Sequence, residues 1–308
     1  MIARALTRAA VVADRALESA GRLLSRSRKF ARGEPATTVF EIDWRLGDEI
    51  MALPVFEAFK RARPRERLVA RVRHAELLHG NPHVDAVNPA QVAAERWVVV
   101  RGERPGVARR AVVEKLSGLS LAGLVPRVYL SAEERAMPPW AWPGDGGGPR
   151  VLVHARASQA CKHWPDARWR ELATRLVKHG CRVVEVGVGR PVLEAADSLV
   201  GRTSVRELAR FLAQAEVVVG DDSGPLHLAL AVGTRVVGIF GATRADLLYV
   251  SAPLFTPLTT EAECRFCWSR WELAYPSGAC PRPRHECMEG VAVATVADAV
   301  LAQMAAVR

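Results

Sequence analysis

The stretch Ala215–Thr243 (AEVVVGDDSGPLHLALAVGTRVVGIFGAT) constrains the fold of this chain most, because it places a short helix between two buried strands. Val217–Val219 and Val236–Phe240 are β-branched, apolar runs of the kind that a parallel sheet covered on both faces buries. The helix at Leu226–Val232 follows the loop Asp221–Pro225, whose Asp, Ser and Pro are typical of an N-cap and first turn. The free N–H groups of such a helix start predict an anion site, although a loop that only caps the helix explains the same residues.

Strands and helices alternate along most of the remaining chain. This alternation predicts an α/β protein whose parallel sheets carry helices on both faces. Pro54 falls inside one expected helix and should kink it or delay its regular part. The expected strands are Val39–Asp43, Leu68–Val72, Trp97–Val100, Val151–His154 and Arg182–Val186, and the expected helices are Glu49–Arg61, Ala167–His179, Leu193–Leu199 and Val205–Gln214.

A segment dense in Pro and Gly, Pro138–Pro149 (PPWAWPGDGGGP), predicts a linker between two domains. At 308 residues the chain is long enough for two domains that each bury a core. We therefore expect a basic helix and linker at residues 1–37, an N-terminal α/β domain at 38–145 and a C-terminal α/β domain at 146–308.

Four polar or Gly-bearing loops follow strands of the second domain. Since the carboxyl ends of parallel strands share one edge of a sheet, these loops should converge there, where open α/β sheets bind ligands. Their convergence is a stronger argument for a ligand site than any single loop. The loops are His154–Lys162, Gly187–Leu193, Asp221–Pro225 and Gly241–Thr243.

Four segments of the chain resemble the motifs of glycosyltransferase family 9, the heptosyltransferase-like enzymes, at the expected spacing. The resemblance extends over roughly residues 38–305 and leaves the arm at 1–35 outside. The segments are GDDSGPLHLA at 220–229 with Gly233 and Val236–Thr243, RLGD at 45–48 with ALP at 52–54, HA at 154–155 with KHWP at 162–165 and Trp169, and Cys287–Met288 before a last helix.

The resemblance implies a GT-B architecture, in which two Rossmann-like domains face a cleft, with the acceptor on the N-terminal domain and the donor on the C-terminal one. It implies an inverting, metal-independent transfer of a sugar from a nucleotide diphosphate, with ADP-heptose favoured as donor and no cofactor for catalysis. The sequence contains no Asp-x-Asp triplet of the kind with which metal-dependent glycosyltransferases hold a cation, and this agrees with the resemblance. Such an enzyme would act at the cytoplasmic face on a cell-envelope glycolipid or glycan, as in lipopolysaccharide biosynthesis.

By the same resemblance, Asp48 is the general base that takes the proton of the acceptor hydroxyl, a role that suits a carboxylate at a strand-to-helix turn. The alternative for Asp48 is an N-cap of the following helix. Lys162 would contact phosphate as a point charge, against the alternative of a solvated surface lysine. Trp164 is expected to pack. The other expected donor-binding residues are Glu194 for the ribose, Asp222 for the sugar, Ser223, Gly224 and Thr243 for the diphosphate, and His227, which faces either the cleft or the core.

The first domain, from Thr38 to about Met137, is shorter than its usual counterpart in the family, so a heptose acceptor on lipopolysaccharide does not follow from the resemblance. Two other functions stay open. One is a nucleotide-sugar reaction such as epimerisation on the same fold, which carboxylates on both sides of the sugar would favour. The other is a scaffold that binds nucleotide sugars without catalysis.

The N-terminal arm carries half of the net charge of +10, because residues 1–35 hold eight Arg and Lys against three acids. Its basic and aliphatic residues would fall on opposite sides of a helix, which predicts a basic amphipathic helix. It would dock on the protein, lie on an anionic membrane surface through residues 1–30 or bind nucleic acid, and the last is disfavoured because no aromatic residues are interleaved. No stretch approaches the roughly 18–20 apolar residues of a membrane span. The resemblance implies a cytoplasmic protein that acts at the inner face of the membrane. The basic residues are Arg4, Arg8, Arg15, Arg22 and Arg26.

A cluster of cysteines lies near the C-terminus with the spacing C-x2-C-x12-C-x6-C, and His285 is close by. In a chain without a secretion signal, clustered cysteines are more often metal ligands than disulfides, so we expect a structural Zn²⁺. The alternative is four reduced thiols packed in a loop. Cys161 and Cys181 are isolated in the sequence. The cluster consists of Cys264, Cys267, Cys280 and Cys287.

Overall fold

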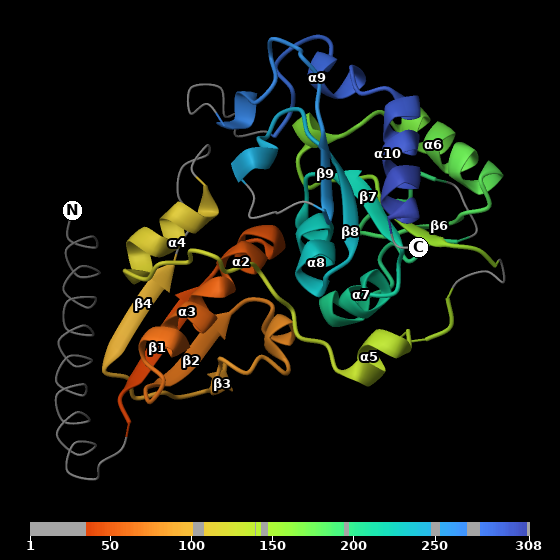
Figure 1. Ribbon diagram of the computed structural model, residues 1–308. Helices are drawn as coiled ribbons and strands as arrows, with labels where there is room; N and C mark the ends of the chain where they lie inside the picture. The colour runs from red at the N-terminus through yellow and green to blue at the C-terminus, as the bar shows by residue number, and fades with distance from the viewer. Residues whose placement is uncertain are drawn as a thin grey trace, which may run out of the picture.

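The computed structural model describes residues 35–100, 108–138, 140–142, 147–193, 197–247, 253–269 and 278–306. Two parallel sheets, one in each half of the chain, organise these residues (Figure 1). The first sheet has the order β3-β2-β1-β4, with β1 (Thr37–Ile42), β2 (Arg67–Val72), β3 (Ala86–Val87) and β4 (Arg96–Val100). The second has the order β6-β5-β7-β8-β9, with β5 (Arg150–His154), β6 (Arg182–Glu185), β7 (Val217–Asp221), β8 (Arg235–Ile239) and β9 (Phe255–Leu258).

Helices cover both faces of the second sheet, whose strands bury alternate residues in two separate cores. α7 (Val205–Leu212) and α8 (Gly224–Val232) lie on one face, and α6 (Asp166–Lys178) and α10 (Val293–Ala305) on the other. In the first sheet the described helices α2 (Leu46–Ala52), α3 (Pro54–Ala62) and α4 (Arg109–Ser117) pack on one face. The shorter elements are α5 (Ala132–Ala136), α9 (Glu286–Glu289), and the 3-10 turns η1 (Ala75–Leu78), η2 (Ala160–Lys162), η3 (Ala245–Leu247) and η4 (Cys267–Ser269).

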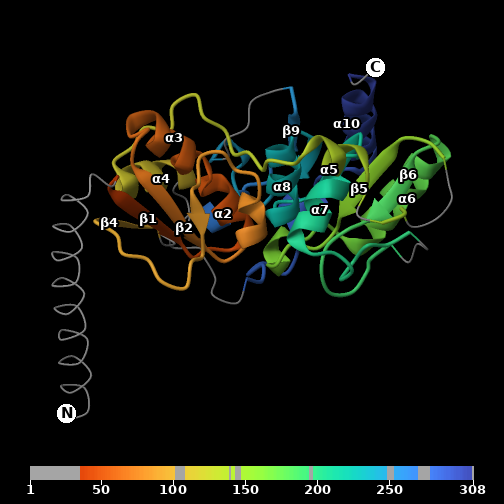
Figure 2. The ribbon, with the colours of Figure 1, turned by 90° about the horizontal axis from the view of Figure 1, so that it is seen from below.

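The two halves of the chain are packed against each other through α2 and α8, which Figure 2 shows side by side. Leu46 fills the space beside Gly224, where an added Cβ would lie 2.9 Å from Leu46 Cδ2. The N–H of Val128 donates to the carbonyl oxygen of Ala231 at 2.9 Å. One apolar core therefore continues from the first sheet to α8.

The structure confirms the expected parallel α/β architecture, and Pro54 begins α3 so that the helix expected at Glu49–Arg61 is divided in two. The helix expected at Leu193–Leu199 is wrong in its described part, because Ser198 forms a parallel bridge with Glu185 instead. The buried Glu185 carboxylate accepts the N–H groups of Val192 and Leu193 at 2.9–3.0 Å, which fixes a loop there. Among the described residues, only the second sheet carries helices on both faces, as expected; the first sheet carries them on one face.

The strands β3 and β9 were not indicated by the sequence pattern. The basic helix expected at the N-terminus lies outside the described residues. In the part of the chain that the structure describes, no helix is both long and apolar enough to cross a membrane.

Candidate active site

A cavity of about 1060 Å³ lies between the two halves of the chain and is lined by both. It meets each sheet where the strand order reverses, between β1 and β4 and between β5 and β7. Such switch points are where open α/β sheets bind ligands. All four loops expected to converge contribute to the lining. The first half supplies Arg45, Gly47, Asp48, His74 and Arg109, and the second His154, Gly187, Lys162, Asp222, Ser223, Gly224, His227 and Thr243.

The first residues of α8 carry free backbone donors at this cavity. Ser223 has the extended backbone of an N-cap residue, with φ −160° and ψ 168°, but its side chain makes no cap. Its Oγ instead shares a hydrogen bond of 2.9 Å with His154 Nδ1. Among the described residues, the N–H groups of Ser223 and Gly224 have no hydrogen-bond partner. The loop is therefore more than a helix cap and can hold an anion.

The same corner contains a buried, neutral histidine. Burial, with a smaller contribution from the charge of His163, lowers the pKa of His154 to about 4. Its ring packs against Gly187, where an added Cβ would lie 3.0 Å from His154 Cδ2. His154 thus joins the loop after β5 to the start of α8 without adding charge near pH 7.

Lys162, Asp222 and His227 form a polar cluster beside the start of α8. Lys162 Nζ lies 2.8 Å from Asp222 Oδ2, and His227 Nε2 lies 3.5 Å from Asp222 Oδ1. Burial alone would raise the pKa of Asp222, but Lys162 and His227 outweigh it and hold the pKa well below its ordinary value. His227 therefore belongs to the cavity, and Lys162 is not a solvated surface lysine.

A second aspartate, Asp221, is fully buried behind this cluster. Its Oδ1 accepts the backbone N–H of Trp164 at 3.1 Å, and burial raises the pKa of Asp221 well above its ordinary value. The Trp164 ring is also fully buried and donates to the carbonyl oxygen of Val291 at 3.0 Å. Both residues shape the loop, and Trp164 packs as the sequence indicated.

Asp48 lies in the first turn of α2 on the opposite wall of the cavity. Its Oδ1 accepts a hydrogen bond from Arg109 Nε at 2.6 Å, and the Arg109 guanidinium lies 5.4 Å from the Trp44 ring centroid. Asp48 is not the N-cap, because Arg45 occupies that position. The sequence did not reveal Arg109, since the pair joins residues 61 positions apart.

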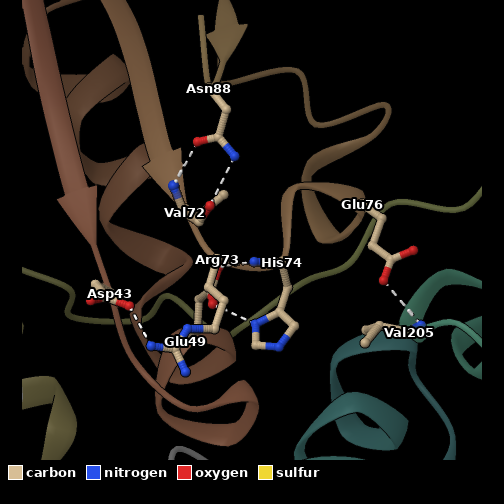
Figure 3. A network of polar contacts seen from close by, with 8 residues as sticks. All are labelled: Asp43, Glu49, Val72, Arg73, His74, Glu76, Asn88 and Val205. Carbon is tan, nitrogen blue, oxygen red and sulfur yellow. Dashed lines mark hydrogen bonds and ion pairs between the residues drawn. The ribbon is translucent and has the colours of Figure 1, made fainter. Parts of the chain in front are cut away.

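A buried carboxylate next to Asp48 fixes a histidine at the same wall (Figure 3). Glu49 is fully buried, its Oε2 lies 2.7 Å from His74 Nδ1, and its Oε1 accepts the His74 N–H at 3.2 Å. The preceding strand end is fixed by Asn88, whose side chain makes two hydrogen bonds of 2.9 Å with the backbone of Val72. Sequence reasoning missed Glu49 and His74, because an acid in a first helical turn is common.

Thr243 supplies an unused hydroxyl to the cavity. Its Oγ1 is buried and has no hydrogen-bond partner among the described residues. A buried hydroxyl without a protein partner is available to hydrogen-bond a ligand, such as a phosphate oxygen. Glu194, expected at the ribose, lies outside the described residues.

The six cysteines are free thiols, and most of them gather in one region. Burial raises the pKa of Cys287 to about 12, and the thiols of Cys264, Cys267 and Cys280 contribute to the shift. Burial raises the pKa of Cys161 to about 11, with contributions from Cys267 and Cys280, so Cys161 is isolated in sequence only. Within the described ranges, no three or more His, Cys, Asp or Glu side chains are already arranged to hold a metal ion.

Two α/β domains that face a cavity at their strand ends define the GT-B class of proteins. The dodecameric iron-containing glycosyltransferase TibC from enterotoxigenic E. coli has a similar fold, with a TM-score of 0.71 and 19% identity over 89% of this chain and 77% of that one. The ADP-heptose lipopolysaccharide heptosyltransferase II of E. coli aligns with a TM-score of 0.65 and 14% identity over 87% and 99% of the two chains. The GT-B fold expected from the resemblance is thereby confirmed.

The profile of glycosyltransferase family 9 (heptosyltransferase) matches residues 90–270, more than half of the chain, and the chain belongs to this family. Lipopolysaccharide heptosyltransferase 1 of Pseudomonas aeruginosa is 32% identical over 109 residues, which cover 32% of this chain and 31% of that one. The Escherichia coli enzyme of the same name is 32% identical over 116 residues, or 34% and 36% of the two chains. The chain thus spans about a third of the length of these curated relatives.

Proposed function

We propose that this protein transfers heptose or a related sugar from its ADP-activated form to a hydroxyl of a cell-envelope glycolipid or glycan. The observation that carries the proposal is a single cavity with a carboxylate, Asp48, on one wall and the start of α8 with its free N–H groups, Ser223–Gly224, on the other. Membership of family 9 supports a glycosyltransferase. The ligand ADP-D-β-D-heptose in a structure of TibC supports ADP as the nucleotide.

The second domain would hold the donor. Lys162 has three N–H donors and uses one on Asp222, so two remain for phosphate oxygens. The amides of Ser223 and Gly224 and the Thr243 hydroxyl would bind the diphosphate as well. Asp222 would accept hydrogen bonds from hydroxyls of the donor sugar, and His227 would keep Asp222 in place.

The first domain would hold the acceptor, with Asp48 as general base. The acceptor O–H bond breaks as its oxygen bonds to the anomeric carbon, and the proton passes to Asp48. The electron pair of the old C–O bond leaves with the diphosphate. Because the hydroxyl attacks from the face opposite the leaving group, the anomeric configuration inverts. The ion pair with Arg109 keeps the Asp48 carboxylate in one orientation.

In this scheme the charge of the leaving diphosphate is met by Lys162, by the start of α8 and by Thr243. The proposed reaction is therefore metal-independent at the active site, and a chelator that leaves the metal proposed below for the cysteines in place should leave the transfer rate unchanged. Loss of transfer on chelation while elemental analysis still finds that metal would contradict this part of the proposal.

The test is incubation of the full chain with ADP-heptose and a cell-envelope glycolipid preparation. A glycosyltransferase releases ADP and adds mass to the glycolipid. An epimerase-like enzyme changes the donor sugar while the sugar stays on ADP. A scaffold binds ADP-heptose and leaves it unchanged, and that result would contradict the proposal.

We also propose that a structural metal ion, either zinc or iron, is bound by Cys264, Cys267, Cys280 and Cys287. Thiolates bind both metals, and the proximity of the four thiols supports a shared ligand. Iron is considered beside zinc because the similar structure of TibC is described as iron-containing, and a measurement must identify the metal. Elemental analysis of the purified chain should find about one metal per chain, and a Cys264→Ser, Cys267→Ser variant should lose it.

We propose that the protein is located in the cytoplasm and acts at the inner face of the membrane, since its proposed acceptor is a membrane glycolipid. Residues 1–30 would supply the contact. Sedimentation with vesicles that contain anionic lipid tests this, with a chain that lacks residues 1–34 as the control.

A further inference from the structure

We propose that the Cys-rich segment is a clamp that positions the two loops proposed to bind the donor diphosphate. The clamp consists of the described residues 264–269 and 278–287. The two loops are the Lys162 loop, residues 159–163, and the Thr243 loop, residues 241–243. The inference rests on the proposed function for the identity of the ligand, and the contacts themselves are independent of it.

The clamp holds the Lys162 loop by both backbone polar groups of one residue. The N–H of Cys161 donates to the carbonyl oxygen of Gly278 at 2.8 Å. His285 Nε2 donates to the carbonyl oxygen of Cys161 at 2.7 Å. Because a carbonyl oxygen only accepts, the His285 ring must carry a proton on Nε2. Lys162 follows Cys161 directly in η2, so the clamp fixes the backbone from which the ammonium group extends.

The clamp holds the Thr243 loop mainly through residues 264–269. The N–H of Phe266 donates to the carbonyl oxygen of Gly241 at 2.7 Å, and that of Trp268 to Ala242 at 2.9 Å. Gly241 also packs against the clamp, since an added Cβ would lie 2.8 Å from Cys287 Sγ. Phe266 has φ 65°, a conformation that a non-glycine residue keeps where surrounding contacts fix it.

Both loops depend on these contacts because neither has much regular structure of its own. η2 spans Ala160–Lys162, and Gly241–Thr243 is a bend after β8. The His285–Cys161 bond joins residues 124 positions apart, so it ties the Lys162 loop to a distant part of the chain. Loosening the clamp should therefore weaken binding of the diphosphate end of a nucleotide and leave binding of the nucleoside end unchanged.

Calorimetry with ADP and with adenosine tests the clamp. In His285→Ala we expect the Kd for ADP to rise about tenfold and that for adenosine to stay within about twofold, because one anchoring hydrogen bond is lost. His285→Gln is the matched control, since its amide nitrogen reaches the place of Nε2, and it should bind ADP within about threefold of wild type. ADP affinity equal to wild type in His285→Ala, or an equal loss for adenosine, would overturn the clamp.

Hydrogen exchange provides a readout that needs no ligand. In His285→Ala, amides in residues 159–163 should exchange about tenfold faster, while amides of β7 keep their wild-type rates. Unchanged exchange in residues 159–163 would overturn the clamp. If the wild type binds neither ADP nor adenosine, the proposed function fails, and the exchange result still decides the clamp.

Discussion

At the scale of single residues, Lys162 and Asp222 are an ion pair with little exposure, 16% and 9% of their side chains. Lys162→Ala would leave the Asp222 carboxylate buried without its ammonium partner, so the free energy of unfolding should fall by about 3 kcal/mol. Lys162→Met combined with Asp222→Asn removes both charges and should recover most of that stability while ADP affinity stays low. Urea denaturation measures both, and a loss in the double variant as large as in Lys162→Ala would contradict the account.

His154 gives the folded protein a pH dependence whose sign follows from burial. Burial lowers its pKa from 6.5 to about 4, so between these pH values the unfolded chain binds more protons than the folded one. Above about pH 6.5, where His154 is neutral in the folded and the unfolded chain, the free energy of unfolding keeps its full value. It decreases by on the order of 3 kcal/mol as the pH falls toward 4. Asp221 acts in the opposite direction over this range, because its pKa is raised.

The measurement is therefore the difference between the wild type and His154→Gln. From pH 7 to pH 4, the variant should lose less stability than the wild type, because glutamine does not titrate. Parallel curves of unfolding free energy against pH would show that the buried His154 ring does not control this transition.

At the scale of elements, the contact between α2 and α8 leaves no room for a side chain at Gly47. An added Cβ would lie 2.7 Å from His227 Cδ2. Although alanine suits a helix better than glycine, we expect Gly47→Ala to lose about 1–3 kcal/mol through overpacking and to weaken ADP binding, since His227 contacts Asp222. Gly147→Ala is the control, because nothing lies within 4 Å of its added Cβ. Equal melting temperatures for the two variants would contradict this.

The elements that carry the proposed donor site could be predicted from the sequence, because each is encoded locally. The β-branched run that forms β7 and the glycine that ends α8, at Gly233 with φ 91°, are readable in a few residues. The pairing of Asp48 with Arg109 could not be predicted, since it joins distant positions. The same holds for Glu49 with His74, where a helix acid reaches a loop after another strand.

At the scale of the whole molecule, polar contacts join α7 to segments that precede β5 in the chain, in addition to the α2–α8 contact. Arg206 of α7 donates to both carboxylate oxygens of Glu134, at 2.9 and 2.7 Å, and to the carbonyl oxygen of Tyr129 at 2.8 Å. Glu76 Oε1 accepts the Val205 N–H at 3.0 Å (Figure 3). These contacts place the wall that carries Asp48 opposite the proposed donor loops before any ligand binds.

In the proposed reaction, Asp48 of the first domain takes the acceptor proton while the second domain holds the donor. Turnover of ADP-heptose by Asp48→Asn is compared with that of the wild type, with a cell-envelope glycolipid as acceptor. Asparagine keeps an oxygen for Arg109, so ADP affinity should stay within about twofold, whereas kcat should fall by roughly 10²–10⁴-fold. Turnover by Asp48→Asn within about threefold of wild type would contradict a general-base role of Asp48, since loss of a general base costs far more than that.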